Sequence, residues 1–209
     1  MLIATFQYGL RHRSVMDILS GGMVLTANEN SCLLHIVVDA EASINSIINA
    51  KAEVRRDALI EEWRPRLYAD DSVTELPADP DDLATLILVR SDYKTRAQKD
   101  AAADPVLPTS TTQKDKYDAV TRSGSTVTLF SSGITITDLL GNCILAYVQD
   151  LEEWVYGAVL GMVNRGKKKM IARYHPIIMD DASVTTMPAT EDGLITMILA
   201  RSDYQRLGG

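Results

Sequence analysis

A basic run in the second half of the chain is the densest group of side chains that could do chemistry. Arg165 is followed closely by Lys167, Lys168 and Lys169. Clustered cations of this kind can bind phosphate groups or an acidic partner. The alternative is a solvated helix surface, because lysine and arginine usually stay in water. We predict a candidate basic contact that comprises Arg165, Lys167, Lys168 and Lys169.

A charged and aromatic tetrapeptide occurs twice. Arg90-Ser91-Asp92-Tyr93 recurs as Arg201-Ser202-Asp203-Tyr204. Its arginine and aspartate can form an ion pair within the chain, and its tyrosine can anchor the last turn of a helix. The same side chains also suit a contact between subunits, and both interpretations stay open. The candidate subunit contacts are Arg90, Asp92, Tyr93, Arg201, Asp203 and Tyr204.

The chain lacks the short motifs of common catalytic sites. It contains no GxxxxGK[ST], GxGxxG, HExxH, CxxC or GxSxG sequence. The three histidines, His12, His35 and His175, are scattered, and none has a histidine at the matching position of the other half. The pairs Asp70-Asp71 and Asp180-Asp181 lack the spacing of a calcium loop, so we interpret them as solvated loops. We expect no enzyme activity, no metal and no cofactor.

Composition and charge place the chain among ordinary globular proteins. Of its 209 residues, 46% are hydrophobic and 23% are charged. No apolar run approaches the roughly 18 to 20 residues that span a bilayer, so we expect no membrane contact. The apolar stretch at residues 1–8 precedes Arg11 and Arg13, the reverse of a secretory signal, which favours use without export. A net charge of -7 is unlike that of most free-standing nucleic-acid binders.

One offset of 111 positions relates the two halves of the chain. It matches both tetrapeptides and, without a gap, seven further pairs: Gly22/Gly133, Thr26/Thr137, Cys32/Cys143, Asp39/Asp150, Pro65/Pro176, Pro77/Pro188 and Leu83/Leu194. We therefore predict a tandem duplication with a first repeat unit at residues 1–96, a polar linker at 97–117 and a second unit at 118–209. The matched cysteines are expected to fill the same core position as small buried side chains.

Each unit is expected to begin with a short β-hairpin. The first spans residues 15–25 around Ser20-Gly21-Gly22, and the second spans 126–137 around Ser131-Ser132-Gly133. A long helix follows in the second unit, because apolar residues recur there at three- and four-residue steps: Ile144, Val148, Leu151, Val155, Val159 and Met162.

Capping residues and prolines mark the expected helix ends. Thr137 or Asp138 is placed to begin the second unit's helix, and Pro65 and Pro176 are expected to stop helical stretches. A final helix begins at Asp79-Pro80 and, in the second unit, at Thr190. The predicted fold class is mainly α: a tandem duplication of a unit of about three helices, each preceded by a short β-hairpin.

The segment from Ala40 to Arg96 resembles the small helical head-to-tail adaptors of tailed phages, which stack beneath the portal. The shared layout is an alanine-rich helix with isoleucine at its centre (residues 40–48), a loop with Leu76-Pro77, and a closing helix with an arginine and a tyrosine near its end (residues 83–93). The family usually carries one such unit, whereas this chain carries two. Its Arg-Tyr pair before the loop occurs only as Arg173-Tyr174.

The resemblance implies a structural virion protein. It implies a homo-oligomeric ring in the neck, made in the host cytoplasm, that joins portal to tail proteins. DNA would pass through its lumen without sequence-specific binding, and the family has no catalysis and no cofactor. Two other hypotheses stay open. One is a cellular tandem-repeat helical interaction module with an exposed apolar groove. The other is an enzyme whose pocket is lined by titratable groups from both units.

Overall fold

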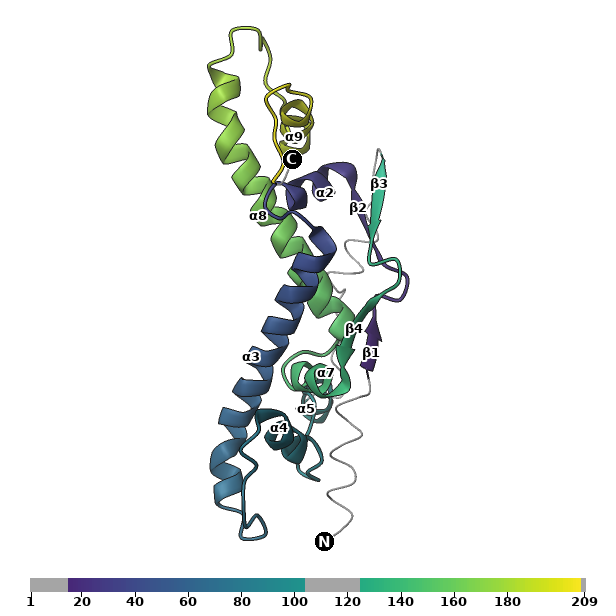
Figure 1. Ribbon diagram of the computed structural model, residues 1–209, viewed down its shortest axis with the longest axis vertical. Helices are drawn as coiled ribbons and strands as arrows, with labels where there is room; N and C mark the ends of the chain where they lie inside the picture. The colour runs from purple at the N-terminus through teal and green to yellow at the C-terminus, as the bar shows by residue number, and fades with distance from the viewer. Residues whose placement is uncertain (1–14, 104–124, 208–209) are drawn as a thin grey trace.

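Two long helices set the shape of the molecule. The computed structural model describes residues 15–103 and 125–207; the basic N-terminal segment and most of the predicted linker lie outside these ranges. Helices α3 (Ala40–Tyr68) and α8 (Leu151–Met179) have 29 residues each and extend from the middle of the molecule toward opposite ends (Figure 1). At 1.5 Å per residue each is about 44 Å long, which makes the molecule elongated.

The same order of elements occurs in both halves. The first half contains β1 (Val15–Ile18), β2 (Met23–Thr26), α2 (Ala27–Leu34), α3 and α4 (Pro80–Leu88). The second half contains β3 (Thr126–Leu129), β4 (Ile134–Thr137), α7 (Asp138–Leu145), α8 and α9 (Glu191–Leu199). Every bound in the second set lies 111 positions after its counterpart. The fold is therefore mainly helical with two small antiparallel sheets.

The predicted hairpins are wrong, because each strand pairs with a strand of the other half. Strand β1 pairs with β4 and β2 with β3, both antiparallel. Ile18 lies opposite Ile134 and Met23 opposite Leu129, with the same number of residues between these positions on both strands. The pairing register of the first sheet is therefore the same as that of the second, although a turn interrupts the chain between them. An isolated two-stranded hairpin is marginal in water, whereas this exchange brings the apolar faces of all four strands into one core.

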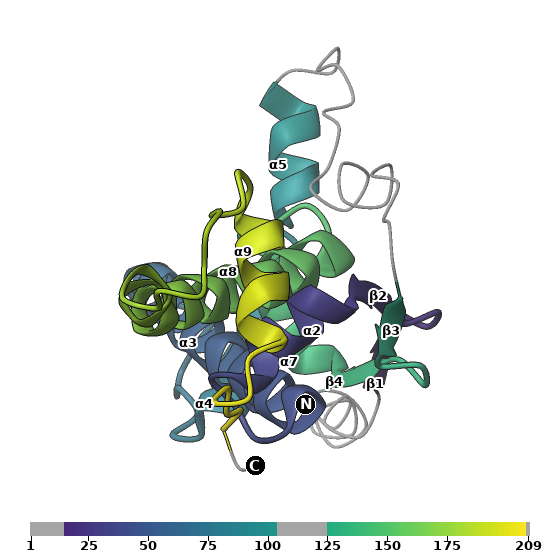
Figure 2. The ribbon, with the colours of Figure 1, turned by 90° about the horizontal axis from the view of Figure 1, so that it is seen from above.

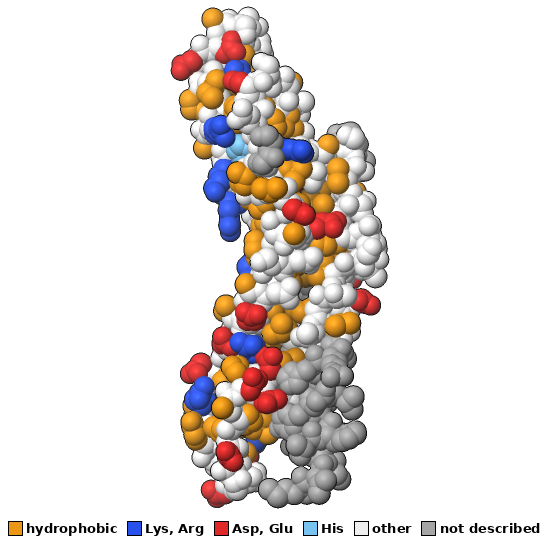
Figure 3. All heavy atoms as spheres, viewed as in Figure 1, with side chains coloured by type: hydrophobic (Ala, Val, Ile, Leu, Met, Phe, Trp, Pro, Cys, Tyr) orange, Lys and Arg blue, Asp and Glu red, His pale blue; other side chains and the backbone are white. Residues whose placement is uncertain are grey.

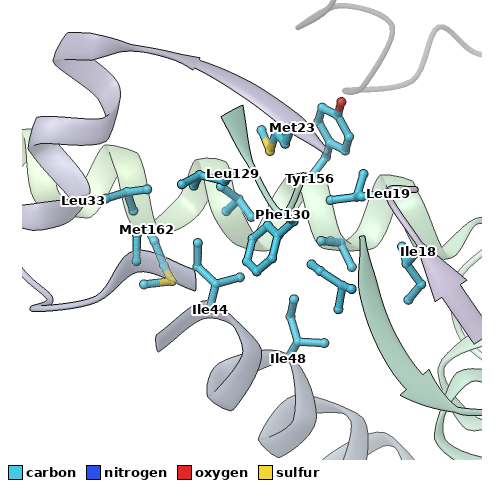
Figure 4. Close-up of a cluster of buried hydrophobic side chains, with 14 of the residues drawn as sticks. Ile18, Leu19, Met23, Leu33, Ile44, Ile48, Leu129, Phe130, Tyr156 and Met162 are labelled. Atoms are coloured by element: carbon cyan, nitrogen blue, oxygen red, sulfur yellow. The ribbon is translucent and has the colours of Figure 1, made fainter. Parts of the chain in front are cut away.

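A sharp bend replaces each hairpin turn. Leu19 and Phe130 occupy equivalent positions and have φ values of 55° and 53°. Residues other than glycine rarely adopt such values. Both side chains are buried, and Figure 4 shows Phe130 directed into the cluster that contains Ile44 and Ile48. The Phe130 amide also donates a hydrogen bond to Glu41 Oε1 at 2.6 Å. Burial therefore offsets the backbone strain of about 1–3 kcal/mol at this bend.

Gly22 is expected to be essential at the first bend, and its neighbour Gly21 is not. Gly22 has φ 73°, and a Cβ there would lie 2.7 Å from the Leu129 carbonyl oxygen, whereas a Cβ at Gly21 would meet nothing within 4 Å. We expect Gly22→Ala to lower the free energy of unfolding by about 2–3 kcal/mol and Gly21→Ala to change it by less than about 0.5 kcal/mol. Urea denaturation of both variants measures this, and equal losses would contradict the strand exchange.

Three apolar cores lie along the described part of the molecule, and each contains residues of both halves. The central core contains the strands and the first parts of α3 and α8. One distal core joins the end of α3 and α4 to α7, around the buried Trp63. The other joins the end of α8 and α9 to Cys32 of α2, around the buried Tyr174. A short helix from one half therefore completes the core of the other half (Figure 1).

The helix boundaries confirm some predictions and correct others. Thr137, Asp79 and Thr190 are N-caps, as predicted. The predicted long helix of the second unit is in fact two helices, because Asp150 accepts a hydrogen bond from the Glu153 amide at 2.9 Å and begins α8 anew. Its apolar stripe is continuous because both helices reach the central core.

Pro65 and Pro176 do not stop a helix. Both lie within the last turn of a long helix, which continues to Tyr68 or Met179. A proline removes one hydrogen bond from the helix, and near its end that loss disturbs few residues.

A further helix, α5 (Arg96–Ala103), begins where the polar linker was predicted. Asp100 of α5 accepts hydrogen bonds from Arg96 Nε at 2.9 Å and from Gln149 Nε2 at 2.7 Å. Seen from above, α5 projects from the body, while the strands lie on the flank opposite α3 and α8 (Figure 2). The start of the predicted linker is therefore helical and is attached to the turn before α8.

Candidate functional site: a basic helix face and two arginine clamps

A close crossing of α2 and α8 orients the basic run. Gly166 is buried, and a Cβ there would lie 2.6 Å from the Cys32 carbonyl carbon, so the two backbones touch. Met170 and Tyr174 follow at four-residue steps on the same buried side of α8. Because this side of α8 faces the core, the side chains on the opposite side of the helix face solvent.

Four cations form what we call the basic face of α8: Arg165, Lys168, Lys169 and Arg173. All four side chains are exposed. Figure 3 shows Lys and Arg side chains gathered along the edge that the middle of α8 follows. Among the described residues, no carboxylate forms an ion pair with any of the four. Arg173 was missed by sequence reasoning, although its four-residue spacing from Lys169 was a usable signal.

Lys167, which was predicted with this group, belongs to a different environment. Its Nζ lies 3.2 Å from Asp192 Oδ1 and 3.8 Å from Glu191 Oε2, both in the first turn of α9. Lys167 therefore connects α8 to α9, and carboxylates within the chain offset its charge. The prediction of a basic contact at this residue remains untested.

His35, at the end of α2, lies near the basic face. Its ring stacks on Tyr204 with 6.1 Å between centroids and lies at the same distance from Tyr174. Burial lowers the pKa of His35, and the positive charges of Arg173 and Lys169 lower it further, whereas a hydrogen bond with the backbone of Gln205 raises it. Two cations of the basic face therefore favour the neutral form of the neighbouring His35 ring.

The first tetrapeptide forms a clamp, which we call the Arg90 clamp. Arg90 Nε donates to Asp92 Oδ1 at 2.9 Å, and its Nη1 lies 2.8 Å from Asp70 Oδ2. Ser72 donates to Asp70 through its amide at 3.0 Å and its hydroxyl at 2.6 Å. The Tyr93 hydroxyl donates to the Asn142 carbonyl at 3.2 Å. The clamp joins the loop after α3 to the end of α4, and its tyrosine reaches α7.

The Arg201 clamp repeats this arrangement at the other end of the molecule. Arg201 Nε lies 2.8 Å from Asp203 Oδ1, and Nη1 lies 3.0 Å from Asp181 Oδ2. Ser183 donates to Asp181 at 3.0 Å and 2.6 Å. The interpretation of the tetrapeptide as an ion pair within the chain is confirmed at both sites. A contact between subunits through Arg90, Asp92, Tyr93, Arg201, Asp203 or Tyr204 remains a prediction.

The Arg90 clamp is expected to make stability depend on pH in the acid range. Hydrogen bonds from the Ser72 hydroxyl and then Arg90 lower the pKa of Asp70 to about 2. Because this pKa is below the unfolded value, the stabilisation is complete above about pH 4 and is lost as the pH falls toward 2. We expect Asp70→Asn to be less stable at neutral pH and to lose less stability between pH 4 and 2.

Urea denaturation over a pH series measures this effect. Asp71→Asn is the matched control, because Asp71 is exposed and forms no ion pair or hydrogen bond within the described residues. The same pH profile for Asp70→Asn and the unchanged protein would contradict a stabilising role for the clamp.

The acidic loops and the cysteines offer little chemistry. Asp70 and Asp181 are held by serine and arginine, and the described residues contain no cluster of His, Cys, Asp and Glu able to hold a metal ion. Cys32 and Cys143 are free and buried at equivalent positions, as predicted. Burial raises the pKa of Cys32 to about 11 and that of Cys143 to about 12, which disfavours the reactive thiolate.

Two hollows of the described surface are lined mainly by acidic and uncharged residues. One lies between the halves and is lined by Asp17, Asp150 and Glu152 among other residues, without His, Cys or Lys. An open hollow of about 480 Å³ beside the Arg201 clamp is lined by the second half alone. In the second hollow the Ser183 hydroxyl donates to Asp181, which Arg201 also binds, so these groups belong to the clamp.

The long helices also lack the character of membrane spans. Within residues 15–103 and 125–207, no helix combines the length and the apolar sequence needed to cross a bilayer. Comparisons with protein-family models, curated proteins and solved structures gave no match.

Proposed function

We propose that this chain is a structural component of a virion neck. In this proposal it is a subunit of a head-to-tail adaptor ring that joins the portal to tail proteins and surrounds the DNA without sequence-specific binding. Its two units arose by tandem duplication of one helical unit. It has no catalytic role and no cofactor, and its place is the neck of the virion.

The repetition of one clamp at both ends of an elongated body is the main support for this proposal. The Arg90 and Arg201 clamps fix the loops beyond the two long helices with nearly the same distances. A component that spans two neighbours needs two rigid ends, and here both ends are built alike. An acidic chain also suits a channel, because repulsion between DNA phosphates and carboxylates lets DNA slide.

A second candidate is a cellular helical interaction module, and exposed apolar side chains favour it. Tyr68 and Met179 occupy equivalent positions at the ends of the long helices and are 71% and 61% exposed. Ile177 is exposed beside Met179. Large apolar side chains at such positions suit docking to another protein, and this function needs only a monomer or dimer.

Light scattering on the full chain over a concentration series separates the two functions. The adaptor proposal expects a ring of many subunits, or a monomer that assembles when a phage portal protein is added. A stable monomer or dimer, indifferent to concentration and to portal, would refute the adaptor and favour the interaction module.

A further inference from the structure

The two long helices carry opposite charge at equivalent positions. The segment 164–173 of α8 contains five lysines and arginines and no carboxylate. Its counterpart, 53–62 of α3, contains four carboxylates and two arginines. The offset that relates the helices therefore preserves their length and apolar side but not the charge of their exposed side. Since the two helices occupy equivalent places in the fold, the difference in charge lies between two equivalent surfaces and not among scattered residues.

On α3 the exposed carboxylates form what we call the acidic face: Glu53, Asp57 and Glu61. They follow one another at four-residue steps, and Asp57 and Glu61 have side chains that are 61% and 71% exposed. Arginines of the same helix offset part of this charge, because Arg56 Nη2 lies 2.8 Å from Asp57 Oδ1 and Arg64 Nη2 lies 3.2 Å from Glu61 Oε1. Both carboxylates are more than half exposed and can accept hydrogen bonds from a second cation. Arg55 lies over the Tyr147 ring at 5.1 Å, and Arg56 Nη1 lies 2.7 Å from Asp81 Oδ1.

The basic face has the same repeat distance along its helix. Arg165, Lys169 and Arg173 also follow at four-residue steps, and each step corresponds to about 6 Å in both helices. A helix bearing the acidic face can thus lie along the basic face with charges matched step by step. Within one chain the two faces extend toward opposite ends of the molecule (Figure 1), so the partner must come from another molecule.

We propose that the basic face of α8 docks on the acidic face of α3 in a second copy of this chain. Charge selects this pairing, because α8 against α8 would place eight exposed cations together. An antiparallel pair of copies makes the contact twice, and repeated head-to-tail use builds a ring. With a net charge of -7, most other contacts between copies are repulsive, which leaves the basic face to specify the pairing. Only the assembly of this contact into a ring rests on the proposed function.

Charge reversal on each face of the full chain tests the contact. The basic-face variant is Arg165→Glu/Arg173→Glu and the acidic-face variant is Glu53→Lys/Glu61→Lys. Sedimentation over a concentration series is expected to show self-association weakened about tenfold or more by either variant. The chain with all four changes is expected to associate again, because its faces are complementary once more. Raising the salt from about 0.05 to 0.5 M should weaken association of the unchanged chain.

Lys94→Glu/Lys99→Glu is the charge-matched control. Both lysines are exposed, belong to neither face, and form no ion pair within the described residues. This control should leave self-association as in the unchanged chain. Circular dichroism of every variant shows whether the fold is retained, and recovery in the four-change chain excludes misfolding as the cause of lost association.

Other results would overturn the contact. A chain that stays monomeric at all concentrations refutes it, as do reversals that leave association unchanged. Binding of a random-sequence DNA duplex that the basic-face variant abolishes, without any change in self-association, would assign the face to nucleic acid. A ring that survives both reversals keeps the adaptor function and rejects this contact. A closed dimer that the four-change chain restores keeps the contact and rejects the ring.

Discussion

Replacing Gly166 with alanine is expected to lower the free energy of unfolding by about 3 kcal/mol or more. The added methyl group would overlap the backbone of Cys32, and neither backbone can move without disturbing a packed helix. Helix α2 would have to separate from α8, which opens the distal core that holds Tyr174 and Ile178. A side-chain clash can relax by rotation, whereas this clash with a carbonyl group cannot.

Gly161→Ala is the matched control on the same helix. A Cβ at Gly161 would meet nothing within 4 Å, and the residue is exposed. Alanine stabilises an exposed helix position over glycine by about 0.5–1 kcal/mol, so this variant should gain stability. Urea denaturation followed by circular dichroism measures both. If the two variants behave alike, the close crossing of α2 and α8 is refuted.

The two halves, produced as separate chains of residues 1–110 and 111–209, are expected to co-purify as a one-to-one complex. Within the described residues, each of the four strands pairs with a strand of the other half, and each distal core contains a short helix from the other half. Either half alone exposes these apolar surfaces and is expected to aggregate or to pair with itself. A tag on one half, followed by a mass measurement of the eluted material, reads the result.

Two substitutions on β1 sharpen this experiment. Ile18 is buried opposite Ile134, whereas Val15 on the same strand is 57% exposed. Ile18→Asp should abolish co-purification, because it places a charge in the central core at a cost of several kcal/mol. Val15→Asp should leave it intact. Halves that each fold as a stable monomer and ignore one another would refute the exchanged arrangement.

Much of the local structure was predictable because its causes are local. Asp79 before Pro80, Thr137 and Thr190 begin helices through side-chain hydrogen bonds to nearby amides, which a short window of sequence contains. The matched cysteines were predictable because the same pattern of neighbours surrounds both. These features need no knowledge of which half contacts which.

The strand partners could not be predicted, because a hairpin and an exchanged pair use the same residues. Alternating apolar residues bury one face in either arrangement, and glycine at positive φ suits a tight turn and an open bend alike. The deciding feature is the bend at Leu19 and Phe130, where buried side chains offset the backbone strain. That balance depends on Glu41 and on α8, both distant in sequence.

The candidate site was predictable in part for the same reason. The basic run was visible, but the partner of Lys167 is Asp192, which only the folded chain brings near. The Arg-Asp pairing within each tetrapeptide was visible, and its third member, Asp70 or Asp181, was not. Sequence reasoning found charged groups, and the fold decided which of them are already neutralised.

The exchange of strands has a consequence for synthesis on the ribosome. When the first half has left the exit tunnel, the elements of the second half that pack against it, β3, β4, α7 and α8, have not yet emerged. At about 5–20 residues per second, the second half follows roughly 5–20 seconds later. During that interval the nascent chain exposes apolar strands and an unfinished helical core. Cells that make this protein must therefore shield the emerging half, and a chaperone that holds nascent chains should increase its soluble yield.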